Sequence, residues 1–306
     1  MNTRAPVLVL AAACGACAGS RGPQDPATVR PVETVPVREV SLPLREGSLR
    51  FAVIGDSGTG DSNQRAVARA LVEARARFPY TFVIMLGDNL YGPDRPGEYN
   101  RAFQEPYQPL LDAGVKFYAA LGNHDSPNQR FYRHFNMNGE RYYSFKPQDG
   151  VRFFALDSNY MSPEQLAWFG KELEASGSDW KIAFFHHPLY SSGRRHGPHE
   201  ELRAVLEPLF VKHGLNVVFS GHEHFYERIK PQKGVYYFTS GGAAKLRRND
   251  IARSTITASG FDTDYHYMLV EIAGEELFFQ AVSRLQKVVD SGIITRPKRV
   301  EEKAAA

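Results

Sequence analysis

Five short polar stretches follow apolar, strand-like runs of the chain, and this pattern constrains the fold more than any other feature. They lie at residues 55–58, 87–91, 122–125, 186–188 and 221–224. Each combines Gly or Pro with Asp, Asn, Tyr or His, and glycine lets the backbone turn sharply after a strand. In α/β proteins the ligand crevice lies at the carboxyl ends of the strands. We therefore expect the five stretches to converge on one site.

Strands and helices alternate in the first part of the chain, and strands dominate the last part. Apolar runs predict strands at 49–54, 81–86, 115–121, 142–145, 151–156, 181–185, 215–219, 235–239, 265–272 and 276–282. Amphipathic periodicity predicts helices at 64–77, 99–113, 165–176 and 200–213. This order predicts an α/β fold, a four-layer α/β/β/α sandwich of two mixed sheets flanked by helices.

Composition and the terminal segments divide the chain into four parts. With 306 residues, 42% of them hydrophobic, the chain can bury one large core, which we expect at residues 49–290. Residues 19–48 are rich in proline and without period, which predicts an extended linker. We expect a polar C-terminal tail at 291–306. The net charge of +3 is small for this length and disfavours nucleic acid as a partner.

Residues 1–18 have the pattern of an export signal. Arg4 precedes a short apolar stretch followed by small residues, and this stretch is too short to span a bilayer. Both cysteines, Cys14 and Cys17, lie here, so the body has neither a disulfide nor a thiolate metal ligand. Residues 10–14 resemble a bacterial lipobox, which predicts a lipid anchor to the membrane through Cys14; an ordinary cleavage site at 16–18 is the alternative. Either predicts an exported protein, periplasmic or at the cell surface.

The polar side chains of the five stretches are those of a metal centre. Imidazole suits zinc and iron, whereas carboxylate and phenolate oxygens favour harder and more highly charged ions, so the mixed set indicates two unlike metal ions. Two cations about 3.5–4 Å apart need a bridging ligand. Asp88, which can place one oxygen on each ion, is the predicted bridge.

In order and in residue type, the stretches resemble the motifs of the calcineurin-like metallophosphoesterases, and within them the purple acid phosphatases of the tartrate-resistant type. The matching motifs are Asp-x-Gly, Gly-Asp-x-x-Tyr, Gly-Asn-His-Asp, a strand that ends in His, and Gly-His-x-His, across residues 51–242. The resemblance implies the metallophosphoesterase fold. It also implies a ferric ion held by Asp56, Asp88, Tyr91 and His224, and a divalent Fe²⁺, Zn²⁺ or Mn²⁺ held by Asp88, Asn123, His186 and His222.

Tyr91 separates this chain from other members of the superfamily. A phenol with a pKa near 10 binds as phenolate only to a strongly Lewis-acidic cation such as Fe³⁺. The Ser/Thr protein phosphatases carry Asp-Arg-Gly after the second motif, where this chain has Tyr91-Gly92-Pro93. A protein phosphatase is therefore disfavoured.

Three further residues are expected to take part in catalysis. His124, in the third motif, and His196, in a segment that resembles a catalytic loop of the mammalian-type acid phosphatases, are the candidates to protonate the leaving group. Asp125 is expected to orient His124. The His-x-Pro spacing favours His186 over its neighbour His187 as the metal ligand.

The activity implied is hydrolysis of the phosphate monoester of a small phosphorylated substrate, by attack of a hydroxide held at the two metal ions. A phosphodiesterase or a nucleotide-hydrolysing member of the same superfamily is the alternative. A surface binding module that has kept the fold without activity is a rival from another class. Decay of that kind removes ligands, and every motif is present here.

Overall fold

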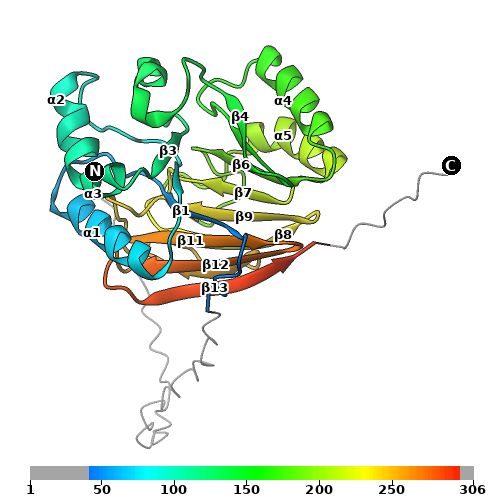
Figure 1. Ribbon diagram of the computed structural model, residues 1–306. Helices are drawn as coiled ribbons and strands as arrows, with labels where there is room; N and C mark the ends of the chain where they lie inside the picture. Colours follow the sequence, from blue (N-terminus) through cyan, green and yellow to red (C-terminus); the bar gives the residue numbers. More distant parts are fainter. Residues whose placement is uncertain (1–40, 297–306) are drawn as a thin grey trace, which may run out of the picture. The chain divides into compact units, whose positions relative to one another are not determined.

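The computed structural model describes residues 41–296 (Figure 1). The expected export signal with Cys14, and the linker as far as residue 40, lie outside the described residues, so export and lipid anchoring stay predictions. Among the helices of residues 41–296, none has both the length and the apolar character needed to cross a membrane.

The first sheet has six strands in the order β13-β12-β11-β1-β2-β3. Strands β1, β2 and β3 run parallel to one another, whereas β11, β12 and β13 are antiparallel to their neighbours. All side chains of β2 are buried, as expected of parallel strands covered on both faces. The bounds are β1 Leu49–Ile54, β2 Phe82–Met85, β3 Lys116–Ala119, β11 His266–Ala273, β12 Glu276–Ser283 and β13 Val288–Thr295.

The second sheet has seven strands in the order β10-β8-β9-β7-β6-β5-β4. Strands β5, β6, β7 and β9 run parallel, and β4, β8 and β10 pair with their neighbours in the antiparallel sense. The bounds are β4 Tyr143–Gln148, β5 Val151–Ala155, β6 Trp180–Phe185, β7 Val217–Ser220, β8 Tyr226–Gln232, β9 Val235–Ser240 and β10 Thr257–Phe261.

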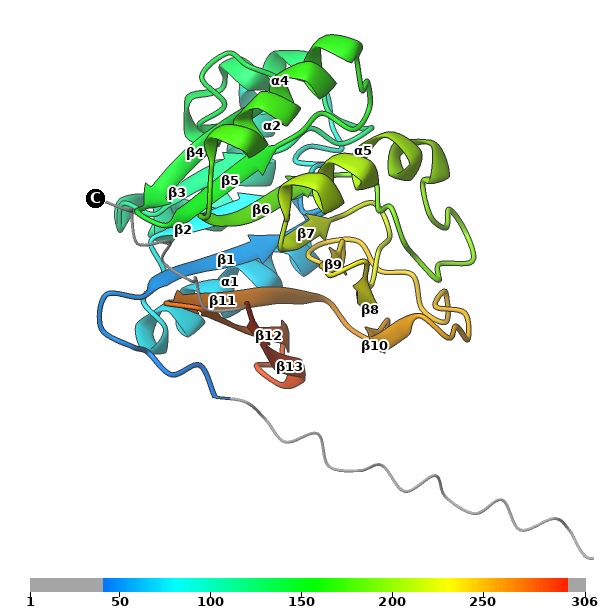
Figure 2. The same cartoon turned by 90° about the vertical axis from the view of Figure 1, so that its right-hand side faces the viewer.

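Helices cover the outer faces of both sheets. Figure 2 shows α4 and α5 on one side of the second sheet, and α1 on the opposite side of the molecule behind β1 and β11. Phe169 of α4 and Phe210 of α5 pack edge to face, with their ring centroids 5.9 Å apart. The bounds are α1 Ser62–Arg77, α2 Pro96–Tyr99, α3 Glu105–Asp112, α4 Pro163–Ala175 and α5 Glu200–His213, with short π- and 3₁₀-helical segments at Asn100–Gln104, Pro127–Phe131 and Arg133–Phe135.

Aromatic side chains join the two sheets face to face. Phe51 of β1 lies 5.2 Å from Phe153 of β5 and 6.2 Å from Phe219 of β7, between ring centroids, and both contacts are edge to face. Phe238 of β9 meets Phe279 of β12 in the same way at 4.8 Å. The predicted four-layer order of helix, sheet, sheet and helix is confirmed.

Two of the expected boundaries differ from the structure. Strand β13 pairs with β12 as far as Thr295, so the first residues of the predicted 291–306 tail belong to a sheet. The end of the predicted 19–48 linker is attached to the body, because the backbone N–H groups of Leu44 and Arg45 donate to the buried Glu271 carboxylate at 2.8 and 2.6 Å. In both places hydrogen bonds order a segment whose polar composition predicts a loop.

Candidate metal centre

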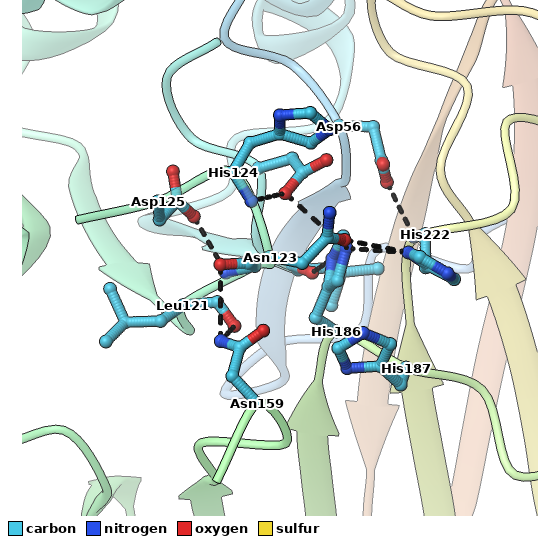
Figure 3. A network of polar contacts seen from close by, with 12 residues as sticks. Asp56, Leu121, Asn123, His124, Asp125, Asn159, His186, His187 and His222 are labelled. Carbon is cyan, nitrogen blue, oxygen red and sulfur yellow. Dashed lines mark hydrogen bonds and ion pairs between the residues drawn. The ribbon is translucent and has the colours of Figure 1, made fainter. Parts of the chain in front are cut away.

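The five polar stretches follow parallel strands and meet at one edge of the two sheets. Asp56 follows β1, Asp88 follows β2, Asn123 follows β3, His186 directly follows β6, and the 221–224 stretch follows β7. Figure 3 shows side chains from four of these stretches pointing toward one another. The predicted convergence is confirmed; the role of each side chain as a metal ligand stays a prediction.

One group of donors consists of Asp56, Tyr91 and His224. The Tyr91 hydroxyl lies 3.2 Å from Asp56 Oδ1 and 3.4 Å from His224 Nε2, and His224 Nε2 lies 3.3 Å from the same Asp56 oxygen. The carboxyl of Asp56 is fully buried, and its second oxygen accepts the backbone N–H of His222 at 2.9 Å. Together with Asp88, these three side chains are the set expected to hold the ferric ion.

A second group consists of Asn123, His186 and His222. Asn123 Oδ1 lies 2.9 Å from His186 Nε2 and 3.0 Å from His222 Nδ1, and these two nitrogens are 3.1 Å apart (Figure 3). The side chain of His186 is fully buried, whereas Asn123 is exposed. These side chains come from the two sheets, so the centre bridges them.

Asp88 lies between the two groups. Its Oδ1 is 3.5 Å from His186 Nε2 and accepts the backbone N–H of His124 at 3.0 Å. One carboxylate oxygen each from Asp56 and Asp88 and one ring nitrogen of His186 lie within 4.8 Å of one another. This is the position that a bridging carboxylate requires.

The protonation of His186 tests whether this geometry fits a cation. Its Nδ1 lies 2.9 Å from the carbonyl oxygen of Leu86, which only accepts, so Nδ1 carries the proton of the neutral ring. Nε2 therefore presents a lone pair toward Asn123 Oδ1. Hydrogen bonding to a backbone carbonyl is the usual way in which a metal-binding histidine is oriented. The facing lone pairs of His186 and Asn123 fit a cation placed against them.

Burial shifts the titration of the same groups; a bound cation would reverse the shift of the acids and reinforce the shift of the imidazoles. Burial raises the pKa of Asp56 to about 8, with the nearby Asp88 charge adding to the effect and His186 opposing it. Burial, followed by the charges of Asp56 and Asp88, raises the pKa of Tyr91 far above its ordinary value. Burial also lowers the pKa of His222 to about 2 and of His224 to about 3. A metal ion binds neutral imidazoles and deprotonated carboxylates.

The backbone at the centre is held in unusual conformations. Asp56, Asp88 and His222 have φ values of 54°, 52° and 69°, in the left-handed region that side chains other than glycine rarely adopt. Close approach explains two of the motif glycines. A Cβ on Gly122 would collide with the backbone nitrogen of Asp88, and a Cβ on Gly221 would lie 2.6 Å from Asp56 Oδ2. Glycine is therefore required at these two positions to leave room for Asp88 and Asp56, and not only to let the backbone turn.

The two expected proton donors lie on different sides of the centre. The exposed His124 ring packs against Tyr91, with the ring centroids 4.8 Å apart. The exposed His196 ring lies 4.3 Å from the ring of His222. Beside His222 is a cavity of about 620 Å³, which is lined by His187, Pro188, Arg195, His196, Gly197, Pro198, His199, Glu200, Glu201 and His222.

The expected contact of Asp125 with the His124 ring is wrong. The Asp125 carboxylate accepts the backbone N–H groups of Gly122, Asn89 and Leu90 at 2.8–3.1 Å, and also the amide of Gln129 at 2.8 Å. Because these donors occupy both oxygens, Asp125 joins the second and third motif loops instead. Burial raises its pKa to about 7.

Several neighbours of the centre are not among the residues expected to act in it. Glu223 is fully buried between the two histidines of the fifth motif and accepts the backbone N–H of Gly197 at 2.7 Å. Arg247 Nη1 lies 3.4 Å from Glu223 Oε2. Lys245 lies over the Tyr91 ring, with its ammonium nitrogen 4.4 Å from the centroid. The position of Glu223 inside Gly-His-x-His was a usable signal, whereas nothing in the sequence marks Lys245 or Arg247.

His187 is half-buried at the edge of the centre. Its Nδ1 lies 2.9 Å from the hydroxyl of Ser158, and its ring is 4.6 Å from that of His222. Ring nitrogens of His186, His187 and His222 lie within 4.8 Å of one another. His187 therefore supports the imidazole cluster from the outside.

Known proteins share both this sequence pattern and this fold. The family model for calcineurin-like phosphoesterases matches residues 49–226. Purple acid phosphatase 7 of Arabidopsis thaliana is 26% identical over 241 residues, which cover 67% of this chain and 73% of that protein. Tartrate-resistant acid phosphatase type 5 of Oryctolagus cuniculus is 26% identical over 245 residues, 65% of this chain and 75% of that protein.

A solved structure of purple acid phosphatase PPD1 from yellow lupin seeds has a TM-score of 0.67 at 17% identity, and the match covers 82% of this chain and 54% of that one. This likeness confirms the fold of two mixed sheets flanked by helices. The family model spans more than half of the chain and includes all five polar stretches up to residue 226. The chain belongs to the calcineurin-like phosphoesterase family.

Proposed function

We propose that this protein is a metal-dependent phosphohydrolase that hydrolyses phosphate monoesters of small substrates. The observation that carries the proposal is the convergence of carboxylate, phenol, amide and imidazole donors on one site, with Asp88 between the two groups. The similarity to purple acid and tartrate-resistant acid phosphatases supports a monoester substrate over a diester.

The donor chemistry favours two different cations at the site. The harder oxygen ligands of Asp56 and Tyr91 suit a ferric ion, and the nitrogen-rich group of His186 and His222 suits Fe²⁺, Zn²⁺ or Mn²⁺. When bound, such a pair supplies Lewis acidity, which acidifies water and neutralises phosphate charge. Asp88 would be shared by both ions, as its position between the groups suggests.

The remaining chemistry belongs to the imidazoles of the chain. Phosphoryl transfer leaves negative charge on the departing oxygen, and a proton at that oxygen lowers the barrier. His124 and His196 are both exposed beside the centre, where either can donate that proton. We expect loss of the proton donor to slow the hydrolysis of alkyl phosphates more than that of nitrophenyl phosphate, because nitrophenolate leaves without a proton. Comparing His124→Ala with His196→Ala on both substrates therefore identifies the donor.

The test compares hydrolysis of p-nitrophenyl phosphate and bis(p-nitrophenyl) phosphate by the metal-reconstituted protein. We expect turnover of the monoester to exceed that of the diester. Asp88→Ala should lower monoester turnover by at least about 10³-fold, because it removes the shared ligand. Asp149→Ala, which removes an exposed carboxylate far from the site, should leave turnover unchanged.

The outcomes separate the alternatives. Faster turnover of the diester would favour the phosphodiesterase reading. Stoichiometric metal without hydrolysis of either ester would favour a binding module and contradict the proposal. Elemental analysis with a visible spectrum identifies the ions, and we expect a visible absorption band that is lost in Tyr91→Phe. A colourless enzyme that is active with manganese alone would contradict the ferric assignment.

A further inference from the structure

The segment after β9, residues 241–250, is fastened to the candidate metal centre by its backbone. The N–H of Arg247 donates to the carbonyl oxygen of His224 at 3.0 Å, and the N–H of Ala243 donates to that of Gly55 at 3.2 Å. The same segment pairs with the loop that carries His196, since the N–H of Arg194 donates to the carbonyl oxygen of Asp250 at 2.9 Å. The backbone of this segment is therefore held in place beside the centre.

Lys245 places a cation directly beside the metal-binding donors. Its ammonium nitrogen lies 4.4 Å from the centroid of Tyr91, whose hydroxyl is 3.4 Å from His224 Nε2. Lys245 is half-buried, and within residues 41–296 no carboxylate forms an ion pair with it. The aromatic face offsets only part of the lost hydration of an ammonium group. An anion from outside the chain would supply the missing partner.

Arg247 adds a second cation on the same segment. Its guanidinium lies 3.4 Å from Glu223, but that carboxylate is fully buried and also accepts the backbone N–H of Gly197. Glu223 thus fixes Arg247 in place, and the side chain keeps 22% of its surface exposed. Guanidinium groups present several donors in one plane, a geometry that matches phosphate oxygens, and lysine binds phosphate as a point charge.

We propose that Lys245 and Arg247 form a second anion subsite beside the metal centre, and that it selects substrates in which the scissile phosphate is joined to another phosphate group. This inference rests on the proposed function, in which the phosphate that reacts occupies the metal centre. The two cations beside the centre would then bind the leaving group. A nitrophenyl or simple alkyl leaving group gives them nothing to bind, whereas a diphosphate does.

The reaction on such a substrate needs no additional reagent. In the hydrolysis of inorganic pyrophosphate, the oxygen of water forms a bond to one phosphorus atom, and the bond from that phosphorus to the bridging oxygen breaks. The electron pair of that bond stays on the bridging oxygen, which receives one proton of the attacking water, and two hydrogen phosphate ions leave. Cations beside the departing phosphate stabilise the charge that develops there.

The test compares kcat/KM for pyrophosphate and for p-nitrophenyl phosphate in the wild type, Lys245→Met, Arg247→Met and Lys245→Arg. A charge-assisted hydrogen bond is worth about 1.5–3 kcal/mol, so each Met variant should lose about tenfold or more on pyrophosphate. Activity on p-nitrophenyl phosphate should change less than about twofold, since that ester lacks the second phosphate. Lys245→Arg should retain the preference. Lys171→Met, on the exposed face of α4, is the matched control and should match the wild type on both substrates.

Equal losses on both substrates, or no loss on either, would overturn the subsite. A binding measurement keeps the inference testable independently of turnover. Calorimetry of pyrophosphate and orthophosphate binding to the metal-reconstituted protein should show tighter pyrophosphate binding, and the ratio should fall about tenfold in Lys245→Met. An unchanged ratio would refute the subsite. Absence of hydrolysis of every ester, with this ratio intact, would refute the proposed function and leave the subsite standing.

Discussion

Asp56 and Asp88 each combine two unfavourable features, since both carboxyls are buried and both backbones have positive φ. A non-glycine residue in such a conformation costs on the order of 1–3 kcal/mol. The fold maintains both because the glycines around them leave room: Gly122 fits against Asp88, and Gly221 against Asp56. A bound cation would offset the cost of burial, because it favours the charged form of each carboxyl.

The close approach of Gly122 gives a prediction. In Gly122→Ala the new methyl group would displace Asp88, so we expect metal content and monoester turnover to fall at least about tenfold, as for loss of a ligand's support. Gly97→Ala is the matched control, because a Cβ at Gly97 meets no atom within 4 Å. Elemental analysis and turnover of both variants test this. Full metal content in Gly122→Ala would show that the loop adjusts without loss.

The convergence of the seven expected metal-binding residues was predictable from sequence because each lies at a fixed spacing from a glycine or a histidine in a strand-end motif. The side chains that surround them were not. Lys245 and Arg247 reach the centre through backbone hydrogen bonds to the fifth motif, and no residue spacing encodes such a contact. Asp125 was assigned the wrong neighbour because sequence adjacency to His124 says nothing about which N–H groups its carboxylate meets.

Among the elements, a buried polar cluster joins the edge strand β13 of the first sheet to β8 of the second sheet. Asp290 of β13 accepts the Tyr226 hydroxyl at 2.7 Å and two nitrogens of Arg228, both from β8, at 2.7 and 3.1 Å. Only 4% of the Asp290 side chain is exposed, against 25% for Arg228. The carboxylate therefore holds the last strand of the first sheet against the second sheet, where β8 begins two residues after His224.

We expect Asp290→Ala to lower the free energy of unfolding by about 3 kcal/mol, because it leaves a half-buried guanidinium and a buried hydroxyl without their acceptor. Asp149→Ala, which removes a fully exposed carboxylate paired with Lys146, should change it by less than about 0.5 kcal/mol. Urea denaturation of both variants measures the difference. Equal stabilities of the two would show that water replaces Asp290 without loss.

Strands with continuous apolar sequences were predictable, and three strands with mixed sequences were not. The predicted bounds of β1 and α5 agree with the structure. Strands β8, β10 and β13 were missed because they carry polar residues within the run. Residues 290–292 of β13 read Asp-Ser-Gly, a turn-like sequence; yet Asp290 binds Arg228, and Gly292 fits against the ring of Phe279. Tertiary contacts decide these strands.

At the scale of the whole molecule, buried titratable groups make stability depend on pH and on metal. Burial lowers the pKa of four imidazoles to about 2–3, those of His187, His222, His224 and His266. Their contribution to the free energy of unfolding is complete above the ordinary histidine pKa of 6.5 and is lost as the pH falls. Burial raises the pKa of three acids to about 7–8, those of Asp56, Asp125 and Glu223. Their contribution to the free energy of unfolding is present at low pH and is lost as the pH rises to those values.

Above pH 6.5 only the acids still titrate differently in the folded and unfolded chains. The folded chain binds more protons there, so the free energy of unfolding of the metal-free protein should fall between pH 6.5 and 8. Bound metal requires deprotonated carboxylates and should reverse this trend. Urea denaturation at several pH values, with chelator and with added metal, tests both signs. Stability that rises with pH in chelator would contradict the assigned burial effects.

Glu223 gives the centre one further property. It is tied to Gly197, next to the expected proton donor, and to Arg247, on the segment that we propose reads the leaving group. Because Glu223 contacts both segments, we expect a change at Glu223 to alter turnover and substrate choice together. Among the described residues Lys245 has no such ion pair, so we expect a change at Lys245 to alter the choice of substrate with little effect on the turnover of simple monoesters.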